Sequence, residues 1–251
     1  MFKYFFYHYS MLPTDSVGFV TYDKLHLTWL ISLFIIGYLV VIYYKHLDSD
    51  AKILFRKIMA TIMITLEIIK DIILAFTGNF SVEYLPFHLC GIGLILAFIH
   101  AYNPKQLWAE IIYALCLPGA LAALLFPNWT VYPLLNFMHI HSFIIHAMIV
   151  LYPILLLVGK EYHPDYHYYP KVLKFTIIIG IPLFVFNKVF STNFLFVNWP
   201  SEGSPLVIFA KWFGNPGYLI PYVILLFTVL ALMYSPFYLK ERVLSKKAPV
   251  N

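Results

Sequence analysis

The sequence predicts an all-α fold, a polytopic bundle of membrane-spanning helices. Three observations support this prediction: 61% of the residues are hydrophobic, only 12% are charged, and the mean hydropathy is +0.79. Soluble domains carry about 25% charged residues and about 45–50% apolar residues. The apolar residues also gather in stretches near the length of a bilayer crossing. We therefore expect a protein that crosses the membrane several times.

Apolar stretches of bilayer length recur along the chain and predict about seven transmembrane helices. In order, these stretches are Leu25–Tyr44, Lys52–Phe76, Tyr84–Tyr102, Gln106–Phe126, Asn136–Val158, Lys171–Phe190 and Gly217–Ser235. The connections between them are rich in Pro, Gly, Asn and charge, so that water can satisfy their backbone groups. Pro86 is expected near the first turn of the third helix, where a missing N–H is tolerated.

The placement of lysine and arginine orients the predicted bundle, because short loops rich in these residues stay in the cytoplasm. The first connection is basic, and so are the third, the fifth and the C-terminal tail; the first is flanked by Lys45, Lys52, Arg56 and Lys57. Connections 77–83 and 127–135 contain no Lys or Arg, and the long loop 191–216 contains only Lys211. We expect the N-terminus outside and the C-terminus in the cytoplasm.

Three regions follow from this topology. Residues 1–24 form an extracytoplasmic N-terminal segment, residues 25–235 a transmembrane domain of about seven helices, and residues 236–251 a basic cytoplasmic tail. The first region lacks an uninterrupted apolar core followed by a small-residue cleavage site, so we do not expect a signal peptide.

The basic balance of the chain does not predict a nucleic-acid partner. The formal net charge of +5 and the pI of about 9.0 are explained by membrane topology and anionic lipid. Cys90 and Cys116 both lie in expected helices, and their spacing predicts neither a disulfide framework nor a structural zinc site. Cys116 is expected to be a packing residue.

Ionisable and nucleophilic side chains within the apolar stretches give the best clue to function. They are His26, Glu67, Lys70, Asp71, His88, Cys90, His139, Ser142 and His146. Such groups cost a few kcal/mol in a bilayer unless they meet a polar cavity or a partner. In the expected topology they gather in the outer leaflet, with Asn187 and Asn193 near the end of the sixth helix. His88 and Cys90 would lie about 6–9 Å from the outer end of the third helix.

Helical spacing places some of these side chains on common faces. In the fifth helix, His139, Ser142 and His146 share one face, whereas His141 points elsewhere. In the second helix, Glu67 shares a face with Lys70 or Asp71, and a Glu67–Lys70 pair can be purely structural. Several helices thus contribute to one layer, which predicts a pocket reached by lipid from the outer leaflet and by water from outside.

This pocket suits acyl chemistry on a lipid, which requires a nucleophile, a base and an oxyanion donor. Cys90 is the candidate nucleophile and His146 the candidate base, because an imidazole can accept a thiol proton and stabilise the thiolate. The two side chains must touch for this to work. Supporting roles in orienting the base, donating to the oxyanion or binding substrate fall to His26, Glu67, His88, His139, Ser142, Asn187 and Asn193.

Other interpretations stay open. A single membrane cysteine is usually a packing residue, and a helix-borne histidine often only hydrogen-bonds across a bundle. A lipid hydrolase would use a His-activated water, with Cys90 structural. A transporter or small-molecule binding protein would use the charged set as a relay, although no inverted repeat is visible and the inner half of the bundle looks apolar. A zinc or iron site from the histidines and Glu67 is conceivable, but we expect no metal and no cofactor.

The segment Leu85-Pro86-Phe87-His88-Leu89-Cys90 resembles the LP-x-H-x-C signature of YwaF-like bacterial membrane proteins and of the related transmembrane protein 164 family. Later blocks look like those of the family as well. They are Phe126-Pro127, the run His139 to His146, Asn187, Asn193-Phe194-Leu195-Phe196 and Pro200, with His26 and Glu67 as further polar positions. The resemblance covers most of residues 26–226.

This resemblance implies a bundle of about seven helices. The eukaryotic branch of the family implies acyl transfer to glycerophospholipid, with the motif cysteine, here Cys90, as the acyl carrier. The family also looks distantly similar to membrane hydrolases, and fold alone does not select the reaction. We expect a phospholipid or lysolipid substrate, a lysolipid or a lipoprotein amine as acceptor, and a location in the bacterial cytoplasmic membrane.

Overall fold

The regular elements of the described chain are helices, and no strand occurs in residues 2–13 and 18–247, which the computed structural model describes. Parts of the expected N-terminal segment (1 and 14–17) and of the expected tail (248–251) lie outside the described residues. The main helices are α1 (Lys24–Lys45), α2 (Ser49–Phe76), α3 (Leu89–Tyr102), α4 (Gln106–Ile111), α5 (Leu117–Leu125), α6 (Phe137–Val158), α7 (Tyr169–Phe190), α8 (Leu206–Phe213) and α9 (Leu219–Lys247).

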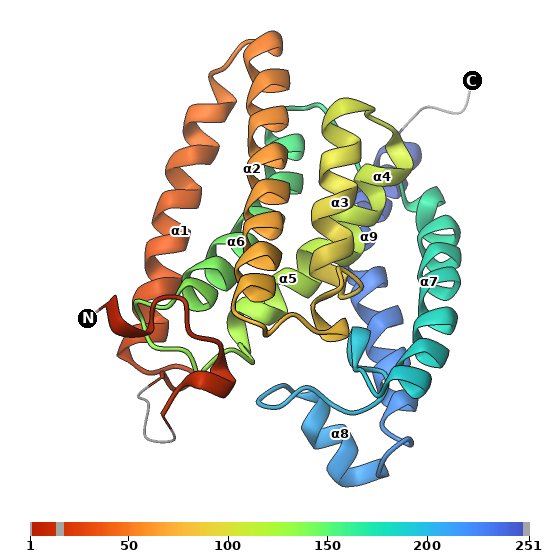
Figure 1. The fold of residues 1–251 in the computed structure, drawn as a ribbon. Coiled ribbons are helices and arrows are strands. Elements are labelled where there is room, and N and C mark those ends of the chain that lie inside the picture. Colours follow the sequence, from red (N-terminus) through yellow and green to blue (C-terminus); the bar gives the residue numbers. More distant parts are fainter. Residues whose placement is uncertain (1, 14–17, 248–251) are drawn as a thin grey trace.

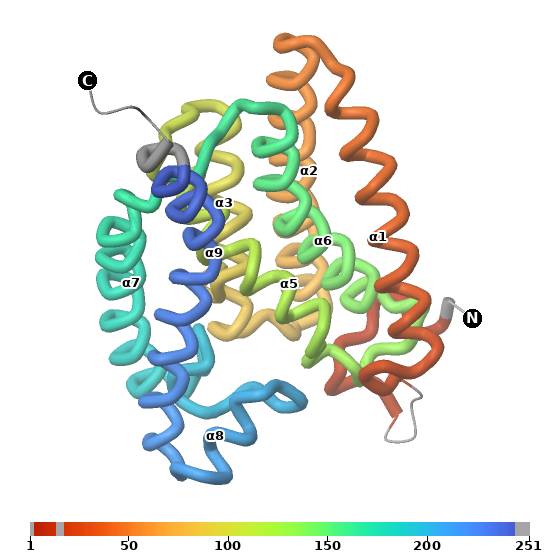
Figure 2. The backbone as a smooth tube through the Cα atoms, turned by 180° about the vertical axis from the view of Figure 1, so that it is seen from behind, coloured from red at the N-terminus to blue at the C-terminus, as the bar shows by residue number. Residues whose placement is uncertain are grey.

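Most of the long helices run roughly side by side, and α5 and α6 are tilted against them (Figure 1). Helices α1, α2 and α6 form one side of the bundle and α7 and α9 the other, with α3 and α5 between them (Figure 2). A π-helical turn, η4 (Ile112–Cys116), joins α4 to α5 without a break. The short α8 lies across the end of the bundle at which α7 ends and α9 begins (Figure 1).

Five helices of the described chain are long and apolar enough to cross a membrane. They are Lys24–Lys45, Gln106–Leu125, Phe137–Val158, Tyr166–Phe190 and Leu219–Val243. Their outer faces carry large apolar side chains with high exposure, such as Phe34 (74%) on α1 and Ile181 (63%) on α7. A surface of this kind is stable only against lipid or another apolar partner. The protein is a multi-pass helical membrane bundle.

The expected helix boundaries agree with the structure except at two places. The third helix begins at Leu89 and not at Tyr84, so the expected depth of His88 and Cys90 was wrong. The cause is Pro86, which disfavours helical backbone at the residue before it, and Leu85 is extended there (φ −57°, ψ 145°). The last helix, α9, continues past its expected end at Ser235 to Lys247.

The N-terminal segment packs against the end of the bundle at which α3 and α6 begin. The backbone N–H of Phe137 donates to the Phe5 carbonyl at 2.7 Å. The Asn136 side chain donates to the carbonyls of Tyr4 and Tyr7, both at 2.8 Å. The ring of His8, which is buried, reaches the Tyr84 hydroxyl. These bonds hold the segment over the end of the bundle that carries most of the candidate site residues.

Candidate functional site

Cys90 lies in the first turn of α3, because His88 is the N-cap residue of that helix. His88 has extended backbone (φ −67°, ψ 155°), and no side chain caps the helix start. The first N–H groups of a helix have no partner within it and carry a partial positive charge. Those of Cys90 and Gly91 lie within hydrogen-bonding reach of the Cys90 sulfur. These N–H groups can stabilise negative charge on the sulfur, whereas burial of the sulfur and the nearby Glu67 carboxylate oppose it.

Gly91 allows the signature segment to fold back onto the start of α3. A Cβ atom at Gly91 would lie 2.7 Å from the Pro86 Cα and 2.8 Å from the Pro86 carbonyl oxygen, so only glycine fits. Gly91 is not among the residues expected in the site. The signal that could have revealed it is its position directly after the motif cysteine.

Charged side chains of α2 form a network around the buried Lys70. The Lys70 ammonium lies 2.5 Å from Glu67 Oε1 and 3.2 Å from Asp71 Oδ1, and the Lys70 side chain is only 9% exposed. The second oxygen of Glu67 lies 3.4 Å from His141 Nε2, at ion-pair distance. The helical spacing predicted that His141 points away from the face that His139, Ser142 and His146 share. His141 nevertheless lies beside Glu67 and within electrostatic range of His146, so it belongs to this network and was not expected there.

The network lies next to the signature cysteine. The Cys90 thiol is within electrostatic range of Glu67 and Lys70. His88 is within the same range of His146 and Lys70, and His146 of Glu67 and His141. The structure thus brings together Cys90, His88, Glu67 and His146, from helices far apart in the sequence, and adds Lys70 and His141.

The His146 ring is held in one orientation. Its Nδ1 lies 2.7 Å from the backbone carbonyl of Ser142, and the ring stacks on Trp129 at a centroid distance of 5.0 Å and an interplanar angle of 15°. A carbonyl oxygen only accepts, so Nδ1 must carry the proton and Nε2 is left as the acceptor. That tautomer is the one a general base needs. Within the described residues, the hydrogen bond of His146 goes to Ser142 and not to Cys90.

His26 and His139 hold neighbouring elements together at this end of the bundle. His26 is fully buried; its Nδ1 accepts from the Tyr22 N–H at 2.9 Å, and its Nε2 donates to the Leu124 carbonyl at 2.8 Å. His139 Nδ1 donates to the Tyr132 carbonyl at 3.0 Å, and its ring packs on Trp29. Both nitrogens of His26 are therefore engaged with backbone.

Asn187 and Asn193 build the loop that follows α7. Asn187 Nδ2 donates to the Phe194 carbonyl at 2.9 Å, and its Oδ1 accepts from the Phe194 N–H. Asn193 Oδ1 accepts from the N–H groups of Asn198 and Trp199, both at 3.1 Å. These bonds position η6 (Phe194–Phe196), on which the His88 ring packs. The two asparagines therefore contribute to the site indirectly, by positioning the loop that contacts His88.

A family model matches most of the chain, including the residues of this site. The model of the TMEM164 family matches residues 21–234, which include the signature segment, Glu67, all residues of the network and the η6 loop. The chain belongs to the TMEM164 family. Searches of curated proteins and of solved structures gave no match. In this TMEM164-family chain no group of three or more His, Cys, Asp and Glu side chains in the described residues has the geometry of a metal site.

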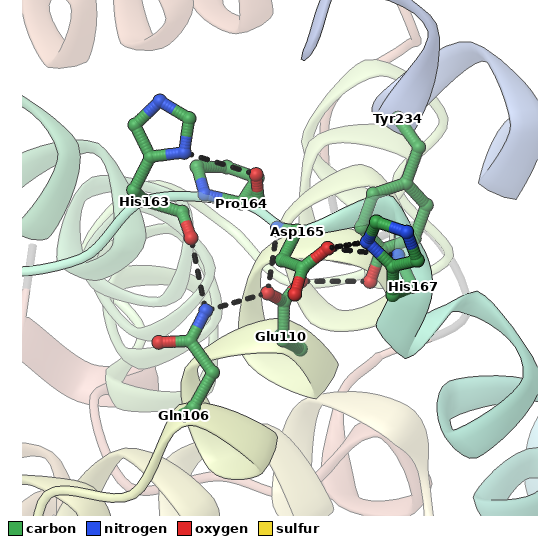
Figure 3. Close-up of polar contacts among 7 residues, drawn as sticks. All are labelled: Gln106, Glu110, His163, Pro164, Asp165, His167 and Tyr234. Carbon is green, nitrogen blue, oxygen red and sulfur yellow. Dashed lines mark hydrogen bonds and ion pairs between the residues drawn. The ribbon is translucent and has the colours of Figure 1, made fainter. Parts of the chain in front are cut away.

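The opposite half of the bundle also contains buried polar groups, so the expectation of an apolar inner half was wrong. Glu110 has no exposed surface and accepts from Gln106 Nε2 (2.7 Å), the Asp165 N–H (2.8 Å) and the Tyr234 hydroxyl (2.8 Å) (Figure 3). The α6–α7 connection, α4 and α9 meet at this carboxylate. The long apolar stretches of the sequence hide such groups, because a single charge scarcely changes the hydropathy of a window.

An ion pair between the buried Arg56 and the partly exposed Glu161 lies at the same end of the bundle. Arg56 Nη1 lies 3.3 Å from Glu161 Oε1, and the Tyr44 hydroxyl donates to the other oxygen of Glu161. The His100 ring hydrogen-bonds the Tyr152 hydroxyl at 2.9 Å nearby. Each of these groups has a hydrogen-bond or ion-pair partner, and such a partner lowers the cost of burying it.

An apolar layer separates the two polar regions. On α2, Met63 lies between Arg56 and Glu67 and has no exposed surface. Leu94 on α3 and Ile149 on α6 occupy the same core cluster and are 2% and 1% exposed. The described structure therefore has two polar regions with buried apolar side chains between them.

Proposed function

We propose that this protein is a membrane-embedded lipid acyltransferase in which Cys90 carries the acyl group as a thioester. The observation that carries the proposal is the environment of the Cys90 thiol. The sulfur lies at the uncapped start of a helix, with two backbone N–H groups in reach and with Glu67 and Lys70 in electrostatic range. The helix start and the Lys70 ammonium favour the thiolate, which is the nucleophilic form, and because burial and the Glu67 carboxylate oppose it, the thiol needs a base that takes its proton during attack.

In the first half-reaction, the Cys90 sulfur attacks an ester carbonyl of a phospholipid, and His146 Nε2 takes the thiol proton. The tetrahedral oxyanion collapses, the C–S bond is kept, and the C–O bond to the glycerol breaks. His146 returns the proton to the leaving alkoxide, which departs as a lysophospholipid. In the second half-reaction, an acceptor hydroxyl or amine attacks the thioester and Cys90 leaves as the thiol.

We assign the oxyanion to His88 and to the first N–H groups of α3. Asn187, the other expected donor, is supported less, because its amide already donates to Phe194 in the loop after α7. Glu67 and His141 are positioning residues for His146, on whose charge they act from the same network. Exclusion of water from this part of the membrane would favour transfer over hydrolysis.

Intact-mass measurement of the purified protein after incubation with defined phospholipids tests this proposal. We expect an adduct of acyl mass in the wild type that neutral hydroxylamine removes. Cys90→Ala should lose the adduct completely, and His146→Ala should lower its rate of formation by about 10²-fold or more. Cys116→Ala is the matched control; Cys116 is buried against Gly93 on α3, and its variant should keep the adduct.

Absence of any adduct in the wild type, or an adduct that survives in Cys90→Ala, would overturn covalent catalysis at Cys90. Phospholipid hydrolysis retained in Cys90→Ala would instead favour a hydrolase in which His146 activates water. The experiment also identifies the donor class, because each phospholipid delivers an acyl group of known mass.

Buried charges in both halves of the bundle favour transport as a second candidate function. Arg56, Glu161 and Glu110 supply polar groups in the half in which we expected none. The apolar layer of Met63, Leu94 and Ile149 argues against a continuous polar path between the regions. Proton-coupled flux in sealed vesicles would decide in favour of transport.

The proposal includes a topology and a location. We propose seven crossings, with α2 and α3 added to the five helices that meet the length and hydropathy criteria, because both run beside them (Figure 1). The N-terminus would be outside, the C-terminus cytoplasmic, and the membrane the cytoplasmic membrane of a bacterium. The distribution of Lys and Arg supports this orientation.

A further inference from the structure

The short helix α8 has an apolar face that nothing in the described part of the chain covers. Lys211 is the one polar residue of this helix. Leu206 is buried, whereas Ile208 is 48% and Trp212 is 73% exposed. Ile208 and Trp212 are four residues apart in the sequence, so they lie on the same face of the helix. A helix face in contact with water normally carries polar side chains, so this face requires another partner.

The position of α8 in the fold places this face near the membrane surface. The candidate span of α7 ends at Phe190, and that of α9 begins at Leu219. Helix α8 lies across this same end of the bundle (Figure 1). The ends of spans lie where the hydrocarbon of a bilayer gives way to the headgroups. The exposed face of α8 is therefore within reach of that boundary.

The surfaces next to α8 are already apolar and exposed. Val189 near the end of α7 and Ile220 near the start of α9 are both large, apolar and exposed. Such side chains on the outside of membrane spans are stable against lipid. The turn between α8 and α9 is closed by the Tyr218 N–H, which donates to the Gly214 carbonyl at 2.8 Å. The apolar face of α8 thus adjoins the lipid-facing surface of the spans.

The residue types of this face suit the membrane boundary. Tryptophan is enriched at the level of the headgroups, where its ring is partly in the hydrocarbon and its N–H is in the polar layer. The neighbouring Lys211 is exposed, and a lysine at this level can lay its aliphatic stem along the apolar surface and keep its ammonium in water. Short amphipathic helices of this kind lie in the plane of the membrane boundary.

The size of the face favours lipid over a protein partner. A stable protein interface buries about 800 Å² on each partner, whereas one aromatic side chain buries about 150–250 Å². Ile208 and Trp212 alone fall well short of such an interface. A bilayer sets no minimum area here, because the spans of α7 and α9 already hold α8 at the membrane.

Helix α8 is also connected to the loop that packs on His88. The Asn215 amide donates to the Asn198 carbonyl at 3.0 Å, and the Tyr218 hydroxyl donates to the Phe196 carbonyl at 2.7 Å. Phe196 belongs to η6, and its ring lies 5.3 Å from that of His88, centroid to centroid. The position of α8 therefore bears on the position of η6.

We propose that α8 is an interfacial helix that docks on the bilayer through Ile208 and Trp212, and that this docking holds the η6 loop against His88. Its partner is the boundary between headgroups and acyl chains in the adjacent leaflet. The proposal does not depend on the reaction proposed for Cys90. It does not depend on the orientation of the protein either, because both leaflets offer this boundary.

Spin labels in the full-length protein measure the depth of α8. In a background with Cys90 and Cys116 replaced by alanine, single cysteines replace Ile208, Trp212 or Glu202, the last in the exposed connection before α8. In phosphatidylcholine vesicles, each label is tested for collision with oxygen, which concentrates in lipid, and with a water-soluble nickel chelate. We expect the labels at 208 and 212 to favour oxygen and to lie about 5–10 Å inside the boundary, and the label at 202 to favour the chelate.

Labels at 208 and 212 that meet the chelate as readily as the label at 202 would overturn the proposal. Labels that neither reagent reaches would overturn it as well, because a second copy of the chain or another protein would then cover the face. Tryptophan fluorescence repeats the test with the native cysteines: the component lost in Trp212→Phe should be quenched by brominated phosphatidylcholine. A component quenched only by aqueous iodide would contradict docking.

Two glutamate variants test the effect of docking on the loop. Trp212→Glu places a charge on the docked face, whereas Lys211→Glu places the same side chain on the neighbouring polar position. In phosphatidylcholine vesicles, hydrogen exchange of residues 194–198 should rise about tenfold in Trp212→Glu and stay unchanged in Lys211→Glu. Equal exchange in the two variants would rule out that docking of α8 holds η6.

Discussion

At the residue scale, Gly91 explains how the signature segment can fold back against the start of α3. The chain turns back at Pro86, and the backbone of that proline occupies the place that a side chain at position 91 would need. The same close approach sets the start of α3, and with it the helix-start environment of Cys90. A residue without chemistry of its own therefore fixes the position of the candidate nucleophile.

Gly91→Ala should destabilise the protein, because the new methyl group overlaps the Pro86 backbone and the helix start must shift. We expect a loss of about 1–3 kcal/mol, as for overpacking elsewhere, visible as a lower melting temperature in detergent. Gly180→Ala is the matched control on α7, where a Cβ would meet nothing within 4 Å. That variant should be neutral or stabilised by up to about 1 kcal/mol, because alanine favours helix over glycine. Equal melting temperatures for the two variants would contradict this interpretation.

At the element scale, the N-terminal segment covers the end of the bundle that contains the site. Its backbone is tied to α6 through Asn136 and Phe137, and its His8 ring contacts η3 (Val82–Tyr84) just before the signature segment. In the proposed reaction, a substrate that enters at this end of the bundle would pass beside this segment. Its attachment therefore bears on access to the Cys90 region.

Docking of the N-terminal segment should weaken in acid. Burial lowers the pKa of His8 below its ordinary value of about 6.5, so the docked segment favours the neutral ring. The groups that face the ring are the Tyr84 hydroxyl at 2.5 Å, the Ser10 hydroxyl at 2.8 Å and the ring of Tyr9. The stability of docking is fully present above about pH 6.5 and is lost as the pH falls through the lower, docked-state pKa.

Hydrogen exchange of residues 3–12 between pH 7.5 and pH 5, corrected for the intrinsic exchange rate, measures this effect. We expect protection to fall in acid in the wild type. His8→Gln, which does not titrate, should show no such pH dependence. Protection that is constant with pH in the wild type would rule out control of docking by His8.

At the scale of the whole molecule, an apolar layer separates two polar regions. This arrangement bears on whether the bundle carries out chemistry at one surface or transport across the membrane. The apolar layer on α2, α3 and α6 lies between the two polar regions, and each region is close to one end of the bundle. Chemistry at one surface fits this division better than passage across it. In the proposed reaction, the orientation of the two ends decides from which side a substrate would reach Cys90.

Cysteine labelling in cells tests the orientation. In a background with Cys90 and Cys116 replaced by alanine, Glu202→Cys lies in the exposed connection before α8 and Asp50→Cys at the exposed start of α2. A membrane-impermeant maleimide should label Glu202→Cys in intact cells and Asp50→Cys only after permeabilisation. The reverse pattern would invert the proposed topology and move the Cys90 region to the cytoplasmic side.

Much of the architecture could be predicted from the sequence by itself. The lengths of the apolar stretches predicted the helices, helix-breaking residues predicted most of their boundaries, and the signature segment indicated the family. All three signals lie in neighbouring residues of the chain. The sequence also singled out Cys90, His88, Glu67 and His146, since any ionisable group in an apolar stretch stands out.

Only the tertiary structure decided which of these residues meet. It brought Glu67 to His141, placed Asn187 in the loop after α7, and moved the start of α3 to Leu89. It also revealed Glu110 and Arg56 as buried, paired charges in the half expected to be apolar. The physical reason is that a residue's period along its helix gives its direction, whereas its partner depends on how the helices are packed and rotated against one another. In a membrane that packing decides whether a charge is tolerated, because the cost of burying it depends on the partner it finds.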